Sequence, residues 1–145
     1  MVKKMKYYCV KQHDITDCGA ACLATISKQY GLNLSISKIR ETAGTDKQGT
    51  NAYGMIKAAE QLGFTAKGVK GNQEAFFTEF PLPAVAHVIV NGSLLHYVVI
   101  HKITKKQENA EKTQQVVHCQ TSIARRRGAH PCGGDNTARR QDIRF

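Results

Sequence analysis

The stretch "KQHDITDCGAACLATISKQYG", residues 11–31, places a single cysteine where the chain turns into a helix. Small and apolar residues recur at helical spacing behind Asp17, whose residue type favours the position before a helix, and Gly31 supplies a stop signal. The spacing therefore predicts a helix over residues 18–30 with Cys18 in its first turn. In that position the unpaired N–H groups and the positive end of the helix dipole stabilise a thiolate.

A glutamine just before this helix adds a second chemical group. Gln12 lies six residues before Cys18, and its side-chain amide is a hydrogen-bond donor. Beside the Cys18 N–H, such a donor would hold the oxyanion of an acyl-transfer reaction, most simply peptide hydrolysis. A distant histidine would take the thiol proton and give it to the leaving amine. These residue types also occur together by chance, so a structural role for Cys18 stays open at this point.

Two further helices are expected downstream. Ser35 or Ser37 begins a short helix that ends at Gly44, and apolar spacing predicts a third helix over residues 52–62. Residues 64–69 alternate between apolar and polar side chains, which is typical of a strand.

The clearest β signal is a hairpin. Residues 84–90, "AVAHVIV", and residues 93–103, "SLLHYVVIHKI", are joined by Asn-Gly at residues 91–92. With these as the two turn residues, His87 faces His96 directly, although a longer loop would shift this register. Helices first and antiparallel strands afterwards indicate an α+β fold, with N-terminal helices packed on an antiparallel sheet.

Composition limits the class of protein only broadly. The chain has 145 residues, of which 41% are hydrophobic, and this suits one domain with a core. Its net charge of +10 favours acidic partners, such as nucleic acid or an anionic membrane surface. Five cysteines without a secretory signal indicate reduced thiols and a cytoplasmic location. No apolar run reaches the length of about 18 residues that a membrane-spanning helix needs.

The basic residues change in kind near residue 107. Residues 1–106 hold 13 Lys and one Arg, whereas residues 107–145 hold one Lys and six Arg. The later segment is polar and rich in turn-forming residues, so it is poorly suited to burying surface. We expect a domain over residues 1–106 and a basic, Arg-rich tail over residues 107–145 that is disordered or foreign to the domain. A natural flexible tail that binds RNA or lipid is the alternative.

Three segments in order resemble the cysteine peptidase domain of bacteriocin-exporting ABC transporters. They are "QHDITDCGAACLATISKQYG" (12–31), "GTDKQGTNAYGMIKAAEQLGF" (44–64) and "LPAVAHVIVNGSLLHYVVIHKI" (82–103). The similarity covers about residues 6–104. It implies a papain-like cysteine peptidase in which Cys18 is the nucleophile, His96 the base and acid, and Gln12 the oxyanion donor.

The same resemblance implies a substrate and partners. The substrate would be a precursor peptide whose leader ends in Gly-Gly, and the partners would be the membrane and nucleotide-binding domains of an ABC transporter. In full-length relatives the peptidase domain lies at the cytoplasmic face of the membrane, and ATP is used by the transporter domains. No cofactor is expected in this chain, which lacks a phosphate-binding loop.

The chain departs from this family at the group that orients the histidine. The family has an Asp-Pro at the position of Lys112, and no Asp-Pro occurs anywhere in this sequence. Two alternatives to a working peptidase follow. One is an impaired module that binds leader peptides, and the other is a nucleic-acid binder that uses the basic tail. The sequence shows no aromatic and basic recognition motif, so nucleic acid ranks last.

The other cysteines and histidines have structural interpretations. Cys22 lies one helical turn after Cys18 and is expected on the apolar face of that helix. His87 is the rival of His96 as a base, and we expect it to be a core histidine of its strand. Four residues of the tail have the chemistry of zinc ligands: His118, Cys119, His130 and Cys132. Their spacing fits no standard zinc module, so no metal site is expected.

Overall fold

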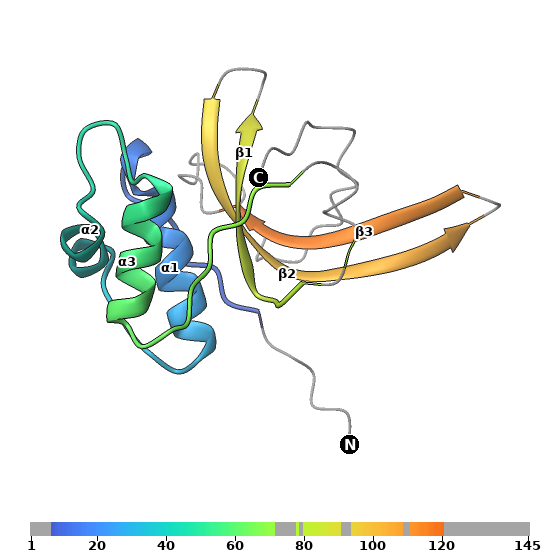
Figure 1. Cartoon of the computed structure of the whole chain (residues 1–145), viewed down its shortest axis with the longest axis horizontal. Coiled ribbons are helices and arrows are strands. Elements are labelled where there is room, and N and C mark those ends of the chain that lie inside the picture. The colour runs from blue at the N-terminus through green and yellow to red at the C-terminus, as the bar shows by residue number, and fades with distance from the viewer. Residues whose placement is uncertain (1–6, 72–77, 79, 91–93, 109–110, 121–145) are drawn as a thin grey trace, which may run out of the picture.

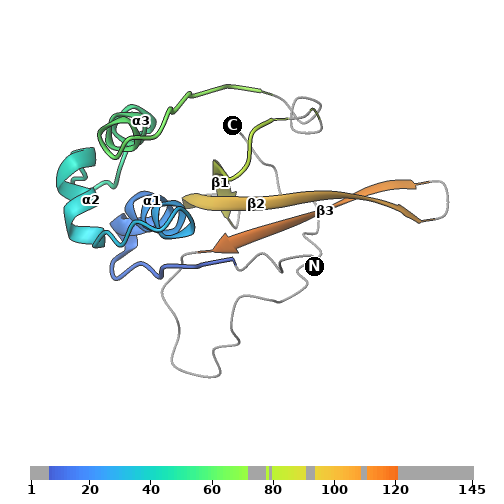
Figure 2. The same cartoon turned by 90° about the horizontal axis from the view of Figure 1, so that it is seen from below.

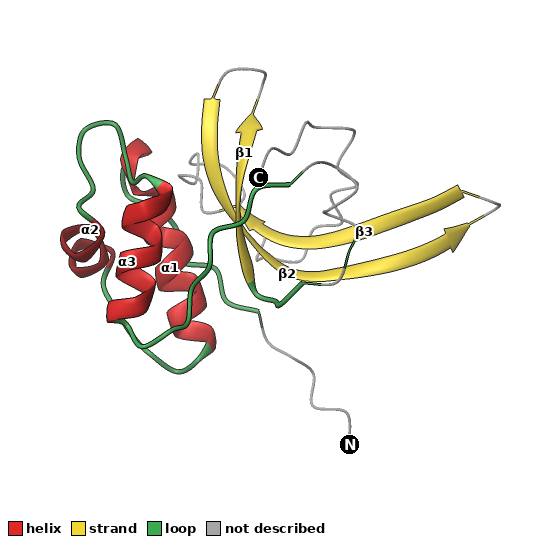
Figure 3. Cartoon of the chain, in the orientation of Figure 1, coloured by secondary structure: helices red, strands yellow, loops and turns green. Residues whose placement is uncertain are grey.

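The computed structural model describes residues 7–71, 78, 80–90, 94–108 and 111–120. Within them the helices come first along the chain and the strands follow. Three helices lie together on one side, and a curved antiparallel sheet lies beside them (Figure 1). Figure 3 shows the same division, with the helices in red and the strands in yellow. The predicted α+β class is therefore confirmed.

The helical part follows the predicted boundaries closely. A short 3-10 helix, η1 (Ile15–Asp17), leads directly into α1 (Cys18–Gln29), and α2 (Ile36–Ala43) and α3 (Ala52–Gln61) follow. Ser35 rather than Ser37 caps α2, because its hydroxyl accepts the Lys38 N–H at 3.2 Å. Gly44 ends α2 with a φ of 64°, a conformation that favours glycine. No helix in the described part of the chain is long and apolar enough to cross a membrane.

The strands are β1 (Ala84–Val90), β2 (Leu94–Glu108) and β3 (Glu111–Gln120), in the order β1-β2-β3. The hairpin exists, but its predicted register is wrong by one residue. Val90 pairs with Leu94, so His87 lies opposite Tyr97 and not opposite His96. Three residues therefore connect the strands. Asn-Gly occurs in three-residue hairpin loops as well as in two-residue turns, so this dipeptide alone does not fix the register.

Residues 64–69 were expected to form a strand, and this expectation is wrong. They have no regular secondary structure. Phe64 and Ala66 still pack against the helical core, whereas the Val69 side chain is 71% exposed. The alternation in sequence therefore reflects an extended segment that lies along the core without a partner strand.

β3 lies inside the segment that we expected to be a tail. It pairs with β2 from Val98 opposite Gln120 to Glu108 opposite Glu111, with an irregularity between Ile100 and Lys102. Residues 111–120 form this strand, and the expectation that the tail is disordered or foreign to the domain stays a prediction. Residues 121–145 lie outside the described residues, and the domain boundary at residue 106 stays a prediction.

The core lies between α1 and the sheet, and β2 passes next to α1 (Figure 2). Side chains of β2 alternate between its two faces. Tyr97 and Val99 join the helices in one buried cluster, whereas Val98 and Ile100 belong to a second cluster with Ala86. Val99 is fully buried, and complete burial of such a side chain contributes about 1.5–3 kcal/mol. This packing attaches the helical part to the strand that bears His96.

Candidate active site

Cys18 is the first residue of α1, as the sequence predicts. Its side chain is 8% exposed and belongs to the core cluster that α1 shares with β2. Cys22, one turn later, is fully buried in the same cluster, so its interpretation as an apolar-face residue is confirmed. Neither of these two thiols forms a disulfide. The first turn of α1 therefore has a slightly accessible thiol at Cys18, and the thiol of Cys22 one turn later is fully buried.

Asp17 occupies the N-cap position of α1, but its side chain does not cap that helix. The carboxylate turns back and accepts the N–H groups of His13 at 3.2 Å and of Asp14 at 2.9 Å. It also forms an ion pair with Arg40 of α2. The expected capping role is wrong because η1 runs straight into α1, which gives Asp17 near-helical backbone angles and directs its carboxylate toward the preceding turn.

Gln12 lies in the same turn. Its side chain is 7% exposed, and its Nε2 donates a hydrogen bond to the Asp14 carbonyl oxygen at 2.9 Å. An amide nitrogen has two N–H groups, so this bond uses one donor of the pair. The Asp14 carboxylate accepts the Thr16 N–H at 2.9 Å, and this bond is the main cause that lowers the Asp14 pKa. The segment before Cys18 is therefore held by a dense set of short-range hydrogen bonds.

His96 lies on β2, opposite Val88 in the sheet, and its side chain is 7% exposed. Burial lowers its pKa, and the charge of His87 adds to this effect. A lowered pKa favours the neutral imidazole, which is the form that can accept a proton. Its Nε2 is buried, and none of the described residues pairs with it. Within the same residues no hydrogen bond joins His96 to Cys18, although α1 and β2 are packed together.

Tyr97 is a site residue that the sequence interpretation missed. It is 8% exposed in the Cys18 cluster, and its pKa is raised by burial and then by the Cys18 and Cys22 thiols. His87 stacks on its ring, with centroids 4.5 Å apart and an interplanar angle of 18°. The alternation along residues 93–103 was the available signal, since it places Tyr97 and Val99 on one face.

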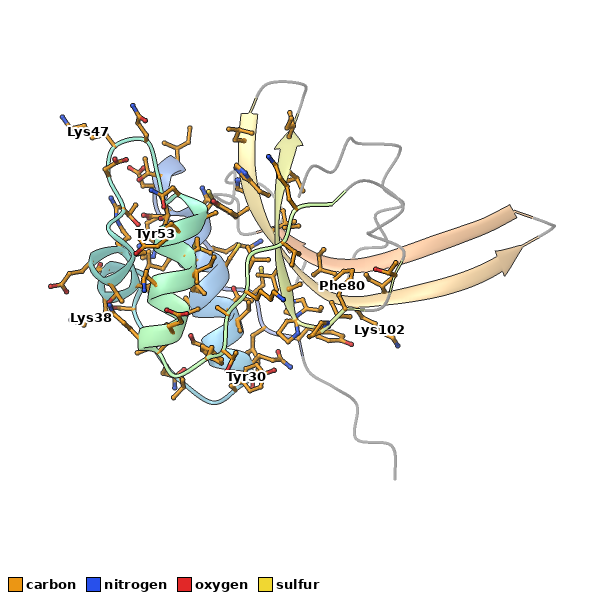
Figure 4. The ribbon with its side chains drawn as sticks, in the orientation of Figure 1. Tyr30, Lys38, Lys47, Tyr53, Phe80 and Lys102 are labelled. Atoms are coloured by element: carbon orange, nitrogen blue, oxygen red, sulfur yellow. The ribbon has the colours of Figure 1, made fainter. Side chains whose placement is uncertain are left out.

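Arg40 was also missed, although it is the one arginine among the basic residues 1–106. It lines a shallow hollow of about 540 Å³ beside η1 and at the same time reaches the buried Asp17. Figure 4 shows Lys47, which lines the same hollow, pointing outward from the connection between α2 and α3. The lining of the hollow mixes acidic and basic groups.

The described residues contain no group of three or more His, Cys, Asp or Glu side chains that could hold a metal ion. The side chains of the tail residues that could ligate zinc lie outside this description.

Cys9 is disulfide-bonded, so the expectation of reduced thiols is wrong for this residue. That expectation rested on compartment, whereas a disulfide depends on which thiols the fold brings together.

Curated relatives are similar over about two thirds of the chain. The Lactococcin-G-processing and transport ATP-binding protein LagD of Lactococcus lactis subsp. lactis is 43% identical over 103 residues, which are 70% of this chain and 14% of that protein. The transport/processing ATP-binding protein ComA of Streptococcus pneumoniae is 40% identical over 90 residues, or 61% of this chain and 13% of that protein. The chain therefore matches only a small part of these longer relatives.

Solved structures agree with the fold. The peptidase domain of Streptococcus ComA, a bi-functional ABC transporter, superposes with a TM-score of 0.67 at 36% identity, and the match covers 81% of this chain and 80% of that one. A double glycine motif protease from an AMS/PCAT transporter, solved with its leader peptide, also gives 0.67. Its identity is 21%, so it supports the fold alone. The papain-like fold is thus confirmed.

The family model agrees with both comparisons. It is described as the Peptidase C39 family and matches residues 6–110. The match contains Cys18 at the start of α1, the turn with Gln12, and the hairpin with His96. The chain therefore belongs to the Peptidase C39 family.

Proposed function

We propose that this domain is a cysteine endopeptidase that removes the leader of a precursor peptide after a Gly-Gly motif, during maturation and export of a bacteriocin or similar peptide. The observation that carries the proposal is the placement of Cys18 as the first residue of α1, packed against the strand that bears His96. The domain would act at the cytoplasmic face of the membrane, beside the membrane and nucleotide-binding domains of an ABC transporter.

The proposed reaction has two halves. His96 takes the proton of Cys18, and the thiolate attacks the carbonyl carbon of the second glycine. The Gln12 amide and the Cys18 N–H hold the oxyanion. His96 then gives the proton to the leaving amine, which departs as the mature peptide and leaves a thioester on Cys18. Water, deprotonated by His96, hydrolyses this thioester and releases the leader.

Paired cysteine variants test this proposal. A synthetic precursor with a leader ending in Gly-Gly is incubated with the chain, and the products are identified by mass spectrometry. Cys18→Ala should abolish cleavage, whereas Cys22→Ala, one turn away in the same helix, should retain it. Replacing either glycine of the peptide by valine should also stop cleavage, because a channel fitted to glycine has no room for a side chain. Cleavage by Cys18→Ala at the wild-type rate would disprove the assignment.

A lower turnover than that of a family member with the Asp-Pro is part of the proposal. Two points support it. The resemblance implies that Lys112 stands where the family has its Asp, and no Asp-Pro occurs in the sequence. The buried Nε2 of His96 has no partner among the described residues. In a serine triad the loss of this carboxylate function costs about ten-thousandfold in rate. A cysteine site should lose less, because a thiol ionises far more easily than a serine hydroxyl and so depends less on an oriented imidazole.

A chimera tests this second part. Residues 107–145 are replaced by a strand that ends in Asp-Pro, and turnover and melting temperature are compared with those of the original chain. We expect turnover to rise. Unchanged turnover, with the original chain already cleaving at the rate of a family member, would show that no orienting Asp is needed.

A module that binds leader peptides without cleaving them is the second candidate, and the partnerless Nε2 of His96 favours it. The two candidates differ in one measurement. The binding module would bind the leader peptide in calorimetry while leaving the Gly-Gly bond intact over hours. The peptidase would release two fragments and lose this activity with Cys18→Ala.

A further inference from the structure

We infer that Arg40 and Asp17 form a positioning pair that fixes the Gln12 amide relative to Cys18. The inference rests on the proposed function, in which Gln12 holds the oxyanion. Neither Arg40 nor Asp17 touches the reacting atoms in this proposal. Both act through the turn that joins Gln12 to the start of α1.

The first link is the Asp17 carboxylate. Asp17 is 2% exposed, and its carboxylate accepts the backbone N–H groups of His13 and Asp14. A side chain at a helix start normally accepts N–H groups of the helix that follows. Here it holds the residues that precede the helix, so Asp17 ties Cys18, its neighbour in sequence, to the turn that contains Gln12.

The second link runs from this turn to the catalytic amide. Gln12 Nε2 donates to the Asp14 carbonyl oxygen at 2.9 Å. The Asp14 N–H donates to Asp17 at 2.9 Å. The N–H of Asp14 therefore binds Asp17, and the carbonyl oxygen of Asp14 binds Gln12. A shift of Asp14 would move the Gln12 amide with it.

The third link is Arg40, which reaches Asp17 from a different helix and lies 23 positions away in sequence. Its helix, α2, is anchored by the buried side chains of Ile36, Ile39 and Ala43 and packs on α1. The Arg40 side chain is 35% exposed and that of Asp17 is 3% exposed. Asp17 is thus a buried carboxylate whose charge is balanced from the protein surface.

Removal of Arg40 should therefore release the turn. A buried carboxylate without its partner is strongly disfavoured, so Asp17 would take up a proton or turn toward water. Either change weakens its bonds to His13 and Asp14. A displacement of about 1 Å at a catalytic group can cost about a hundredfold in rate, so even a small shift of Gln12 should be measurable.

The main test compares Arg40→Met with Lys38→Met, which removes an exposed lysine of the same helix that pairs with Glu41 at the surface. We expect Arg40→Met to lower kcat on a Gly-Gly precursor by about tenfold or more, because the oxyanion is held only in the transition state. KM and the rate of Cys18 alkylation by iodoacetamide should change less than about twofold, since neither depends on the oxyanion. Arg40→Lys should recover part of kcat, and Lys38→Met should match the wild type.

A double-mutant cycle identifies the residue through which Arg40 acts. Gln12→Ala removes the amide, so a further Arg40→Met change should lower kcat by less than about twofold in that background. Independent, multiplying effects of the two substitutions would overturn the inference. A loss confined to KM would also overturn it, because this indicates weaker binding of the substrate before the transition state. A parallel loss of Cys18 alkylation would do the same, because it indicates general damage to the site.

Amide hydrogen exchange distinguishes a failure of the positioning pair from a failure of the proposed function. The N–H groups of His13 and Asp14 should exchange faster in Arg40→Met than in the wild type, and Lys38→Met should leave them unchanged. Faster exchange in a chain that never cleaves the precursor would support the positioning pair and reject the proposed function. Unchanged exchange and unchanged kcat in Arg40→Met would reject the positioning pair and leave the proposed function standing. If Arg40→Met fails to fold, Asp17→Asn and Arg40→Lys are measured in the same way.

Discussion

Two thiols one helical turn apart have different surroundings. Cys18 is the first residue of α1 and is 8% exposed, whereas Cys22 is fully buried. We predict that brief iodoacetamide treatment at neutral pH labels Cys18 about tenfold faster than Cys22, because the reagent can reach the slightly exposed Cys18 thiol and not the fully buried Cys22 thiol. Peptide mass spectrometry measures both sites. Equal labelling in the folded chain would contradict this difference in access, and labelling in guanidinium provides the unfolded reference.

Tyr97 is a core residue that lies beside the candidate active site. Its ring joins the core cluster that contains Cys18 and stacks on His87. We predict that Tyr97→Ala lowers the free energy of unfolding by about 3–5 kcal/mol, as expected for a large aromatic truncation in a core. Tyr97→Phe keeps the ring and should cost much less. Urea denaturation followed by circular dichroism measures both. Equal losses of unfolding free energy would show that the hydroxyl of Tyr97, and not its ring, stabilises the fold.

At the scale of elements, α2 and α3 approach each other at a glycine. A Cβ at Gly54 in the first turn of α3 would collide with the Ala43 carbonyl oxygen, which is backbone and cannot move aside easily. Replacement by alanine would gain about 1 kcal/mol of helix propensity, but overpacking costs about 1–3 kcal/mol and the obstacle is rigid. We therefore predict that Gly54→Ala is destabilising.

Gly68→Ala is the matched control, since a Cβ there would meet only the tip of the Ile56 side chain. Thermal unfolding of the two variants should show a clear loss of melting temperature for Gly54→Ala alone. A Gly54→Ala variant as stable as the wild type would mean that α3 can move away from α2 at little cost.

Within the described part of the chain, three histidines make stability depend on pH. Burial lowers the pKa of His87, His96 and His101 below the usual value of 6.5, and for His101 a backbone hydrogen bond with Tyr8 partly offsets this. As the pH falls through about 6.5, the unfolded chain therefore takes up protons before the folded chain does. Stability that is present at neutral pH should be lost as the pH falls below this value.

We predict that the melting temperature falls steadily between pH 7.5 and pH 5.5, values chosen to lie about one unit on either side of 6.5. His101→Gln should make this slope shallower, and His13→Gln, which changes an exposed histidine, is the control. Differential scanning fluorimetry in buffers of constant ionic strength measures the slope. A melting temperature that is flat across this range would contradict the burial of these groups.

Residues 111–120 of the segment after β2 form β3. The turn-forming residues on which the tail prediction rests lie after residue 120, outside the described residues. A strand at a sheet edge needs backbone N–H and C=O partners more than apolar side chains, and β2 supplies these from Val98 to Glu108. The chain that follows β2 thus covers an edge that would otherwise be open.

The sequence by itself determined the helices, the place of Cys18 and the existence of the hairpin. These features depend on residues within about four positions of one another, such as Asn51 and the Gly54 N–H that it accepts at 2.8 Å. Only the tertiary structure decided the register that sets Tyr97 opposite His87, and the pairing of Arg40 with Asp17. Both depend on how separate elements pack, because α2 brings a charge from 23 positions away to a carboxylate that local rules assign to a helix cap.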